Sequence, residues 1–311
     1  FYQFYHRSDT SRYATRLLRA LWHAVPKIDD AFRHDPRNQK SFMHILTMPK
    51  GTYHALRDMN MWDVLGRFLP AFRPVVGQMQ HDLYHIFTVD QHTLRVVRNI
   101  RRFTRSAFAH EYPHCSHIMA GLDKPWRVVI AGLFHDIGKG QGGQHDVIGA
   151  QRMAEFARDF GFSDDDAAFM VFLVRQHLLM SKVAQRQDIS DPNVVRKFVE
   201  AVGDKTHLDA LYLLTVADIR ATSPKVWTAW KGQLLEKLYY AAADMLTGES
   251  SSEQAMEKRL AQARSSICAK LSPALCDAFW KELNVVYFMR HTTDEIIWHT
   301  LELAPVMHTT H

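Results

Sequence analysis

Several histidine and aspartate residues of this sequence lie within or next to apolar segments, where a buried polar side chain needs a partner. The chain has 311 residues, 19 of them histidine, and the dipeptide His-Asp occurs at 81–82, 135–136 and 145–146. Only His135-Asp136 directly follows an uninterrupted apolar run, at 128–134. Burying such a polar pair without partners is costly. Because imidazole nitrogen and carboxylate oxygen both coordinate divalent cations, the pair predicts a metal site.

Asp218 leads to the same prediction. It is the sole charged residue between Ala210 and Ile219, in a segment that is apolar nearly all round. An unpaired carboxylate there would destabilise the fold or titrate to its neutral form, so it needs a cation. A salt bridge to Arg220 is the alternative, although two residues that lie two apart on a helix do not face each other.

His92 and His177 each lie within an apolar helical pattern. Taken singly, each is better interpreted as a core histidine whose hydrogen bonds are satisfied. Together with His135-Asp136 and Asp218, however, four such coincidences favour one shared site. A divalent metal is the ligand that this set of nitrogen and oxygen donors suits.

The elements that must position these residues are helices. Apolar residues recur every three or four positions almost throughout, and no alternating strand pattern occurs, which predicts an all-α fold. A loop is expected at about 109–124. Capping residues, Pro and Gly place the main helices at about 14–22, 89–103, 126–137, 146–160, 163–180, 191 onward, 208–219 and 226–246.

Composition narrows the class of protein further. Apolar residues make up 47% of the chain and charged residues 23%, which is typical of a globular protein with a sizeable core. No run approaches the roughly 18 apolar residues of a membrane span, and no signal peptide is recognisable. The three cysteines form no CxxC pair, which favours a reducing cytosol. We therefore expect a cytoplasmic protein with no membrane partner, and the lack of an initiator Met suggests an excised fragment.

Two clusters have a structural as well as a functional interpretation. The net charge of +5 includes Arg95, Arg98, Arg101, Arg102 and Arg105 at about helical spacing. A solvated helix face is favoured over a phosphate-binding stripe, and no nucleic-acid partner is expected. The second cluster comprises His110, His114, Cys115 and His117, which have the side chains of a zinc site. Their uneven spacing in a predicted loop argues against zinc.

The constellation resembles the HD superfamily of metal-dependent phosphohydrolases, whose pattern is an isolated His, then His-Asp, then a distal Asp on separate helices. His92, His135-Asp136 and Asp218 match in that order. The resemblance assigns His145 and His177 to the histidines of members that hold a second metal, with Asp136 between the two ions. Gln176 stands where several such members carry another histidine. One or two ions are therefore expected, with Mn²⁺ or Fe²⁺ favoured and Mg²⁺ or Zn²⁺ acceptable.

Longer blocks resemble the bifunctional uridylyltransferase/uridylyl-removing enzymes of bacterial nitrogen regulation. They extend from about residue 14 to residue 300 and include GQMQHDLYH (77–85), AGLFHDIGKGQGGQHDVIGA (131–150), VRQHLLMSKVAQRQDISDP (174–192), LLTVADIRATSP (213–224) and RHTTDEIIWHT (290–300). In that family a nucleotidyltransferase domain precedes this region and two ACT domains follow it. Neither has a counterpart in this sequence, which we therefore interpret as a central fragment.

The resemblance implies three parts: a helical linker segment at 1–76, an HD phosphohydrolase domain at 77–248, and a helical segment at 249–311 that leads toward the absent ACT domains. It implies a phosphodiesterase that removes UMP from a uridylylated tyrosine of the PII signal protein. Asp136 and Lys139 are the expected catalytic residues, with Lys139 on the phosphate or, equally, facing solvent. His81 and His85 are candidates for the pocket wall, although surface positions are favoured.

Two other functions fit the same residues. The HD site would instead hydrolyse free nucleotides, such as guanosine alarmones or deoxynucleoside triphosphates. Alternatively, the metal would be structural and the domain a non-catalytic docking surface for PII.

Overall fold

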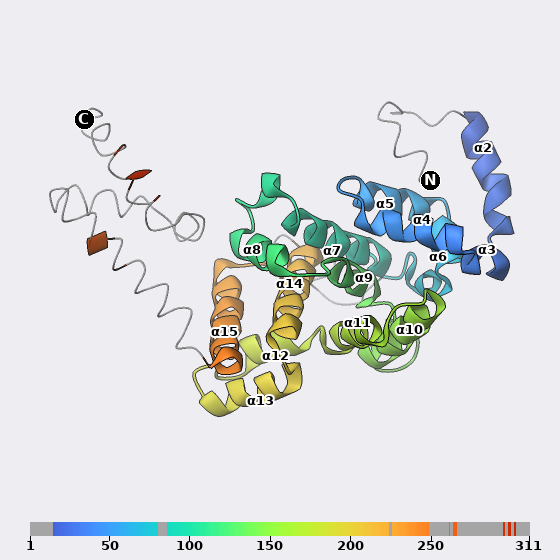
Figure 1. Cartoon of the computed structure of the whole chain (residues 1–311). Coiled ribbons are helices and arrows are strands. Elements are labelled where there is room, and N and C mark those ends of the chain that lie inside the picture. The colour runs from blue at the N-terminus through green and yellow to red at the C-terminus, as the bar shows by residue number, and fades with distance from the viewer. Residues whose placement is uncertain are drawn as a thin grey trace.

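The computed structural model describes residues 15–79, 86–223 and 226–248, together with isolated residues between 261 and 302. Every regular element in these described ranges is a helix, so the prediction of an all-α fold is confirmed. The N-terminal helices lie at one end of the molecule, and α13 (Pro192–Val202) and α15 (Ala229–Thr247) lie at the other (Figure 1). The six candidate metal ligands lie on, or directly after, helices α7 (Val89–Phe103), α9 (Trp126–Phe134), α10 (His145–Asp159), α11 (Asp164–Gln176) and α14 (Lys205–Thr222).

Five short helices form the N-terminal part. Two of them begin at aspartate N-caps, because the side chains of Asp29 and Asp35 accept hydrogen bonds from the backbone amides of Phe32 and Arg37. Pro36 suits the first position of its helix, where no amide hydrogen is needed. The bounds are α2 Thr15–Ala24, α3 Asp30–His34, α4 Pro36–Thr47, α5 Thr52–Met61 and α6 Val64–Phe68, with 3-10 turns η1 Val25–Lys27 and η2 Pro70–Val75.

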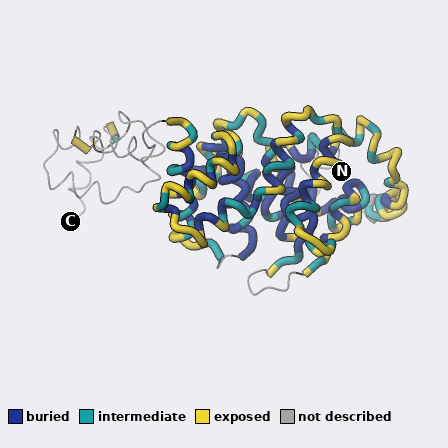
Figure 2. Tube along the Cα trace, turned by 90° about the horizontal axis from the view of Figure 1, so that it is seen from below, coloured by how far each residue is buried: buried dark blue, intermediate teal, exposed yellow. Residues whose placement is uncertain are grey.

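The centre of the remaining part is one apolar helix, α9 (Trp126–Phe134), whose residues 128–134 are all buried. Five helices contact it, namely α4, α7, α10, α11 and α14. Figure 2 shows this buried interior, with exposed segments at the periphery. The other bounds are α7 Val89–Phe103, η3 Ser106–Phe108, α8 Pro113–Gly121, α10 His145–Asp159, α11 Asp164–Gln176, α12 Leu179–Arg186, α13 Pro192–Val202, α14 Lys205–Thr222 and α15 Ala229–Thr247.

Two predicted helices end earlier than expected. The helix expected at 126–137 ends at Phe134, and residues 135–140 form turns. The helix expected at 163–180 is divided at residues 177–178 into α11 and α12. In both places a histidine follows the last helical residue and its Nδ1 contacts a backbone carbonyl three residues earlier. Apolar periodicity continues across both breaks, so it does not reveal them.

The loop predicted at 109–124 contains a helix, α8 (Pro113–Gly121), and that part of the prediction is wrong. Pro113 starts this helix, although the sequence suggested a break there. His114 on α8 is buried against the rings of Tyr212, Tyr239 and Tyr240, at centroid distances of 4.9–5.1 Å. Burial lowers the pKa of His114 to about 4.

This buried histidine makes stability depend on pH. In the unfolded chain His114 becomes protonated below its ordinary pKa of about 6.5. In the folded chain it becomes protonated only near pH 4. The free energy of unfolding is therefore expected to decrease as the pH is lowered from about 6.5 to about 4. The contribution of this group is at most about 1.4 kcal/mol per pH unit. In denaturant titrations from pH 7 to pH 4.5, His114→Phe should lose this part of the slope, whereas His23→Phe, at an exposed position of α2, should keep it. Identical slopes for His114→Phe and wild type would contradict the assignment.

The helical stretch at 164–186 is long and apolar enough, on length and composition alone, to cross a membrane. A core helix passes the same test, and 44% of its most apolar window is buried within the fold. The break at residues 177–178 also falls inside it. This stretch is therefore weak evidence for a membrane span.

Candidate metal centre

Five helices bring the six predicted residues together at one point of the core. Each helix contributes a side chain near its end or on its buried face. His92 lies in α7, and Asp218 lies in α14. The other four occupy helix boundaries: His135 and Asp136 directly follow α9, His145 begins α10, and His177 follows α11.

Glycines permit the close approach that these positions require. A Cβ atom on Gly138, in the turn after Asp136, would collide with the carbonyl oxygen of His145 and lie 2.9 Å from the amide nitrogen of Gly149. Both contacts are with backbone, which cannot move aside as a flexible side chain can. Gly138 therefore allows the turn to lie directly against the start of α10, and so places His145 beside Asp136.

The six side chains form two groups of three, each with all donor atoms within 4.8 Å of one another. The first group contains His92, His135 and Asp218. His92 Nε2 lies 2.9 Å from Asp218 Oδ1 and 3.3 Å from His135 Nε2. His135 Nε2 lies 3.8 Å from Asp218 Oδ1. These separations place two imidazole nitrogens and one carboxylate oxygen around a common point.

The second group contains Asp136, His145 and His177. His145 Nε2 lies 3.4 Å from His177 Nε2, and Asp136 Oδ1 lies 3.7 and 3.8 Å from these two nitrogens. The other oxygen of Asp136, Oδ2, faces the first group at 3.2 Å from His135 Nε2 and 3.6 Å from His92 Nε2. Asp136 therefore presents one carboxylate oxygen to each group.

Hydrogen bonds outside the two groups fix which ring nitrogens face inward. His135 Nδ1 lies 2.9 Å from the carbonyl oxygen of Gly132, and His177 Nδ1 lies 2.8 Å from that of Val174. Because a carbonyl only accepts, each Nδ1 carries the hydrogen, and each ring turns its Nε2 toward the other ligands. Second-sphere bonds of this kind orient histidine ligands in metal sites.

The electrostatics of the cluster also suit a cation. Burial raises the pKa of the Asp218 carboxyl, but the hydrogen bond from His92 and nearby positive charge outweigh this and hold the pKa at about 2. Burial opposes ionisation of Asp136 too, yet His135 and Lys139 hold its pKa well below the ordinary range. Burial lowers the pKa of His177 to about 4. Two carboxylates and a neutral histidine are therefore present at neutral pH, which are the protonation states that metal ligation needs.

These residues fit a divalent metal on three independent grounds. The donors are buried or half-buried, ring nitrogens face one another at 3.3–3.4 Å, and the nitrogen and oxygen donor set suits Mn²⁺, Fe²⁺, Mg²⁺ or Zn²⁺. The alternative partner for Asp218 is excluded, because the Arg220 guanidinium lies over the rings of Tyr112 and Trp227 at 4.4 and 4.7 Å.

Lys139 lies beside the cluster, with its ammonium nitrogen 2.7 Å from Asp136 Oδ2. Its side chain is about one-fifth exposed, as is that of Asp218, and His145 is exposed to a similar degree. The other four ligand candidates, His92, His135, Asp136 and His177, are almost fully buried. The cluster is therefore closed on its α7 and α11 side and open at Lys139, His145 and Asp218.

One arrangement behind the site was not predicted from the sequence. The buried carboxylate of Asp90, in the first turn of α7, accepts hydrogen bonds from the Gly77 amide at 3.1 Å and from Asn60 Nδ2 at 2.7 Å. These bonds tie α5 to the start of the helix that carries His92. An acidic residue in a first helical turn is so common that it gave no signal. His81 and His85, the predicted candidates for the pocket wall, lie outside the described residues.

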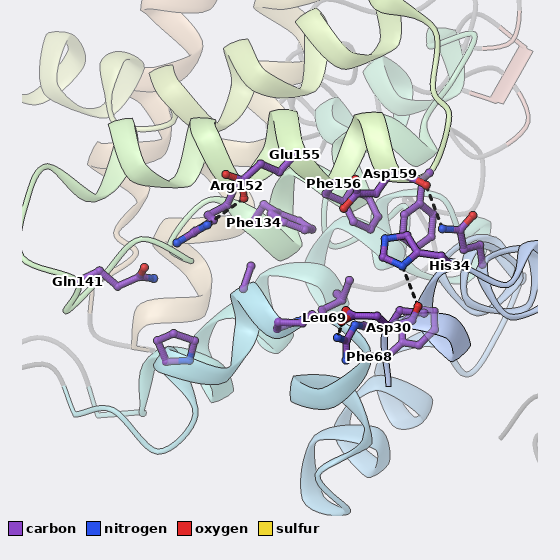
Figure 3. Close-up of a pocket in the computed structure, with 16 residues that line it drawn as sticks. Asp30, His34, Phe68, Leu69, Phe134, Gln141, Arg152, Glu155, Phe156 and Asp159 are labelled. Atoms are coloured by element: carbon purple, nitrogen blue, oxygen red, sulfur yellow. Dashed lines mark hydrogen bonds and ion pairs between the residues drawn. The ribbon is translucent and has the colours of Figure 1, made fainter. Parts of the chain in front are cut away.

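A separate cavity of about 310 Å³ lies between α3, α6, η2 and α10, and none of the six residues lines it (Figure 3). Phe134 lines its aromatic side, and charged side chains line the other. Those charges are compensated within the cavity, since Arg33 pairs with Asp30 and Arg152 pairs with Glu155 at 2.9 Å. The cavity is therefore a neighbour of the metal centre and not a part of it.

The family comparisons agree with this site. The HD domain model matches residues 89–218, which begin and end at the helices that carry His92 and Asp218. Models described as the third and fifth domains of uridylyltransferase GlnD match residues 1–68 and 251–302. The chain thus carries an HD domain, a helical domain that binds divalent metals, between two uridylyltransferase-type segments.

The similar full-length proteins are bifunctional uridylyltransferase/uridylyl-removing enzymes. The chain is 52% identical to that of Bordetella avium over 291 residues, which cover 93% of this chain and 34% of the relative. It is 49% identical to that of Chromobacterium violaceum over 294 residues, 94% of this chain and 34% of the relative. The predicted resemblance to this family is confirmed, and the chain spans about a third of the length of the relatives it matches.

Proposed function

We propose that this chain hydrolyses a uridylyl-tyrosine phosphodiester and releases UMP, acting on the uridylylated PII signal protein in the cytoplasm. The observation that carries the proposal is the position of Asp136, with one carboxylate oxygen facing each histidine group. This arrangement supports two adjacent ions, and two-metal sites are typical of phosphoester hydrolysis. The relatives are named for uridylyl removal, which supports the choice of substrate.

We propose the following roles for the residues. His92, His135 and Asp218 would hold one ion, His145 and His177 would hold the second, and Asp136 would contribute a ligand to each. The bound ions would supply Lewis-acid chemistry, acidifying water and neutralising phosphate charge. Hydrolysis adds water to phosphorus and breaks the bond to the tyrosine oxygen. The phenol group has a pKa near 10, so it leaves without needing a strong general acid.

The open side of the cluster gives the expected direction of approach. Lys139 and His145 lie there, whereas His92, His135 and His177 are buried on the far side. We propose that the phosphodiester enters from this side and that the Lys139 ammonium contacts a non-bridging phosphate oxygen. We also propose the domain boundaries at 76 and 248, which set the HD domain apart from the helices on either side.

The test is release of UMP from uridylylated PII by the Mn²⁺-loaded protein, followed by chromatography. Guanosine alarmones and deoxynucleoside triphosphates are offered in parallel, because a free-nucleotide hydrolase would cleave them in preference. Tight PII binding without UMP release, unchanged in His135→Ala, would instead indicate a docking domain. Either result would overturn the proposed activity of this chain.

Lys139→Met removes the ammonium but retains most of the side-chain length. We expect kcat for UMP release to fall by about 10–100-fold, because one stabilising charge at the phosphate is lost. The metal stoichiometry should stay unchanged, since Lys139 is not among the proposed ligands. The exposed-site variant Lys197→Met serves as the matched control and should keep wild-type kcat. A wild-type rate in Lys139→Met would remove Lys139 from the proposed machinery.

A further inference from the structure

The arginine cluster, which lies on α7 except for Arg105 just after it, is not the solvated helix face that its spacing favoured. Arg98, Arg101, Arg102 and Arg105 are all half-buried and line a cavity of about 280 Å³. The cavity lies where the start of α5 packs over α7. Sequence spacing shows the charges but not the segment that covers them, so this prediction is corrected.

The cavity has excess positive charge, and no carboxylate lines it. Arg102 is neutralised by Glu111, and Arg101 donates to the carbonyl oxygen of Met48 at the end of α4. Lys50, Arg98 and Arg105 form no ion pair within the described part of the chain. Burial and the neighbouring charge of Arg105 lower the pKa of Arg101, as expected for cations that face one another.

Aromatic rings hold the arginines in place before any ligand binds. The Arg98 guanidinium lies 5.6 Å from the centroid of the Tyr53 ring, and those of Arg102 and Arg105 lie 4.0 and 4.7 Å from that of Phe108. Such contacts stabilise a guanidinium while leaving its N–H groups able to donate. Arg98 Nε is buried and makes no hydrogen bond to any described residue.

The start of α5 adds backbone donors at the same place. Its N-cap is Gly51, which has no side chain to accept from the first amides of the helix. Thr52, Tyr53 and His54, the first three helical residues, all line the cavity. Uncapped amides and the positive end of the helix dipole favour an anion there, in addition to the arginines.

We infer that this cavity is a binding site for the phosphate group of a small molecule, separate from the metal centre. The four arginines, Lys50 and the first residues of α5 all line it, and phosphate oxygens suit the guanidinium, ammonium and amide donors that these residues carry. The compensated cavity beside α10 is the contrast, because its arginines already have carboxylate partners. Phosphate esters and inorganic polyphosphate share the chemistry that this site recognises.

The test is isothermal titration of the protein with inorganic pyrophosphate and, separately, with ATP. The double variant Arg98→Gln/Arg105→Gln should weaken binding of the recognised probe at least about tenfold, since each charge-assisted bond contributes on that scale. Arg95→Gln is the matched control on the same helix, because Arg95 does not line the cavity; it should change binding less than about twofold. Circular dichroism checks that each variant is folded.

The Asp136→Asn background separates this site from the metal centre. Binding that persists there and is lost with Arg98→Gln/Arg105→Gln supports the inference, and the two probes distinguish inorganic polyphosphate from a nucleotide. Failure of both probes to bind wild type at millimolar concentration would overturn it. So would equal binding by the double variant. Binding of polyglutamate but of neither probe would overturn it as well, and would assign the surface to an acidic protein partner.

Discussion

Asp136→Asn is expected to abolish UMP release, lowering kcat by at least about 10³-fold, because it removes the one carboxylate that faces both histidine groups. The amide is nearly isosteric but uncharged, and its NH2 group would point a donor at one group. Neither proposed ion would keep its bridging ligand. The measurement is single-turnover release of UMP from uridylylated PII at saturating Mn²⁺.

The control for this variant is Asp123→Asn, the same chemical change at an exposed position. It should keep the wild-type rate. Circular dichroism and thermal unfolding establish that Asp136→Asn is folded, so that lost activity is not lost structure. A folded Asp136→Asn with more than about a tenth of the wild-type rate would contradict the bridging role.

Metal removal is expected to have the largest effect on stability. A ligand that binds only the folded state stabilises it by about 2.7 kcal/mol at a hundredfold excess over Kd. For a domain of this size each kcal/mol moves Tm by about 2–4 °C. Adding Mn²⁺ to chelator-treated protein should therefore raise Tm by about 5–10 °C, measured by differential scanning calorimetry.

Single histidine variants test which group of ligands binds which ion. His92→Gln should remove the first ion and His177→Gln the second, so that metal analysis gives one ion per chain where wild type gives two. His117→Gln, at an exposed position of α8, should bind metal as wild type does. Wild-type stoichiometry in both His92→Gln and His177→Gln would show that these groups are not the ligands.

The sequence was most informative where a polar residue interrupts an apolar run. His135-Asp136 and Asp218 stood out for that reason, and the structure buries them or half-buries them together. His145 gave no such signal, because it begins α10 after a polar, Gly-rich segment and is partly exposed. Only resemblance to a family pointed to it. Burial cost therefore identifies the interior of such a site better than its open edge.

Features that depend on contacts between distant segments were not predictable. The division between α11 and α12 at residues 177–178 falls inside an apolar stretch, and periodicity does not register it. The Gly138 contact with α10 becomes visible only once the two segments are placed together. The cavity at Arg98 likewise depends on where α5 lies, about forty positions earlier in the chain.

The spread of the candidate ligands along the chain has a kinetic consequence. His92 and Asp218 lie on helices separated by most of the HD domain, so neither metal group is complete until distant parts of the chain have assembled. Contacts of that range form late in folding. Bound metal should therefore slow unfolding while leaving the folding rate nearly unchanged. Metal loading would then act mainly on the lifetime of the assembled domain rather than on how quickly it forms.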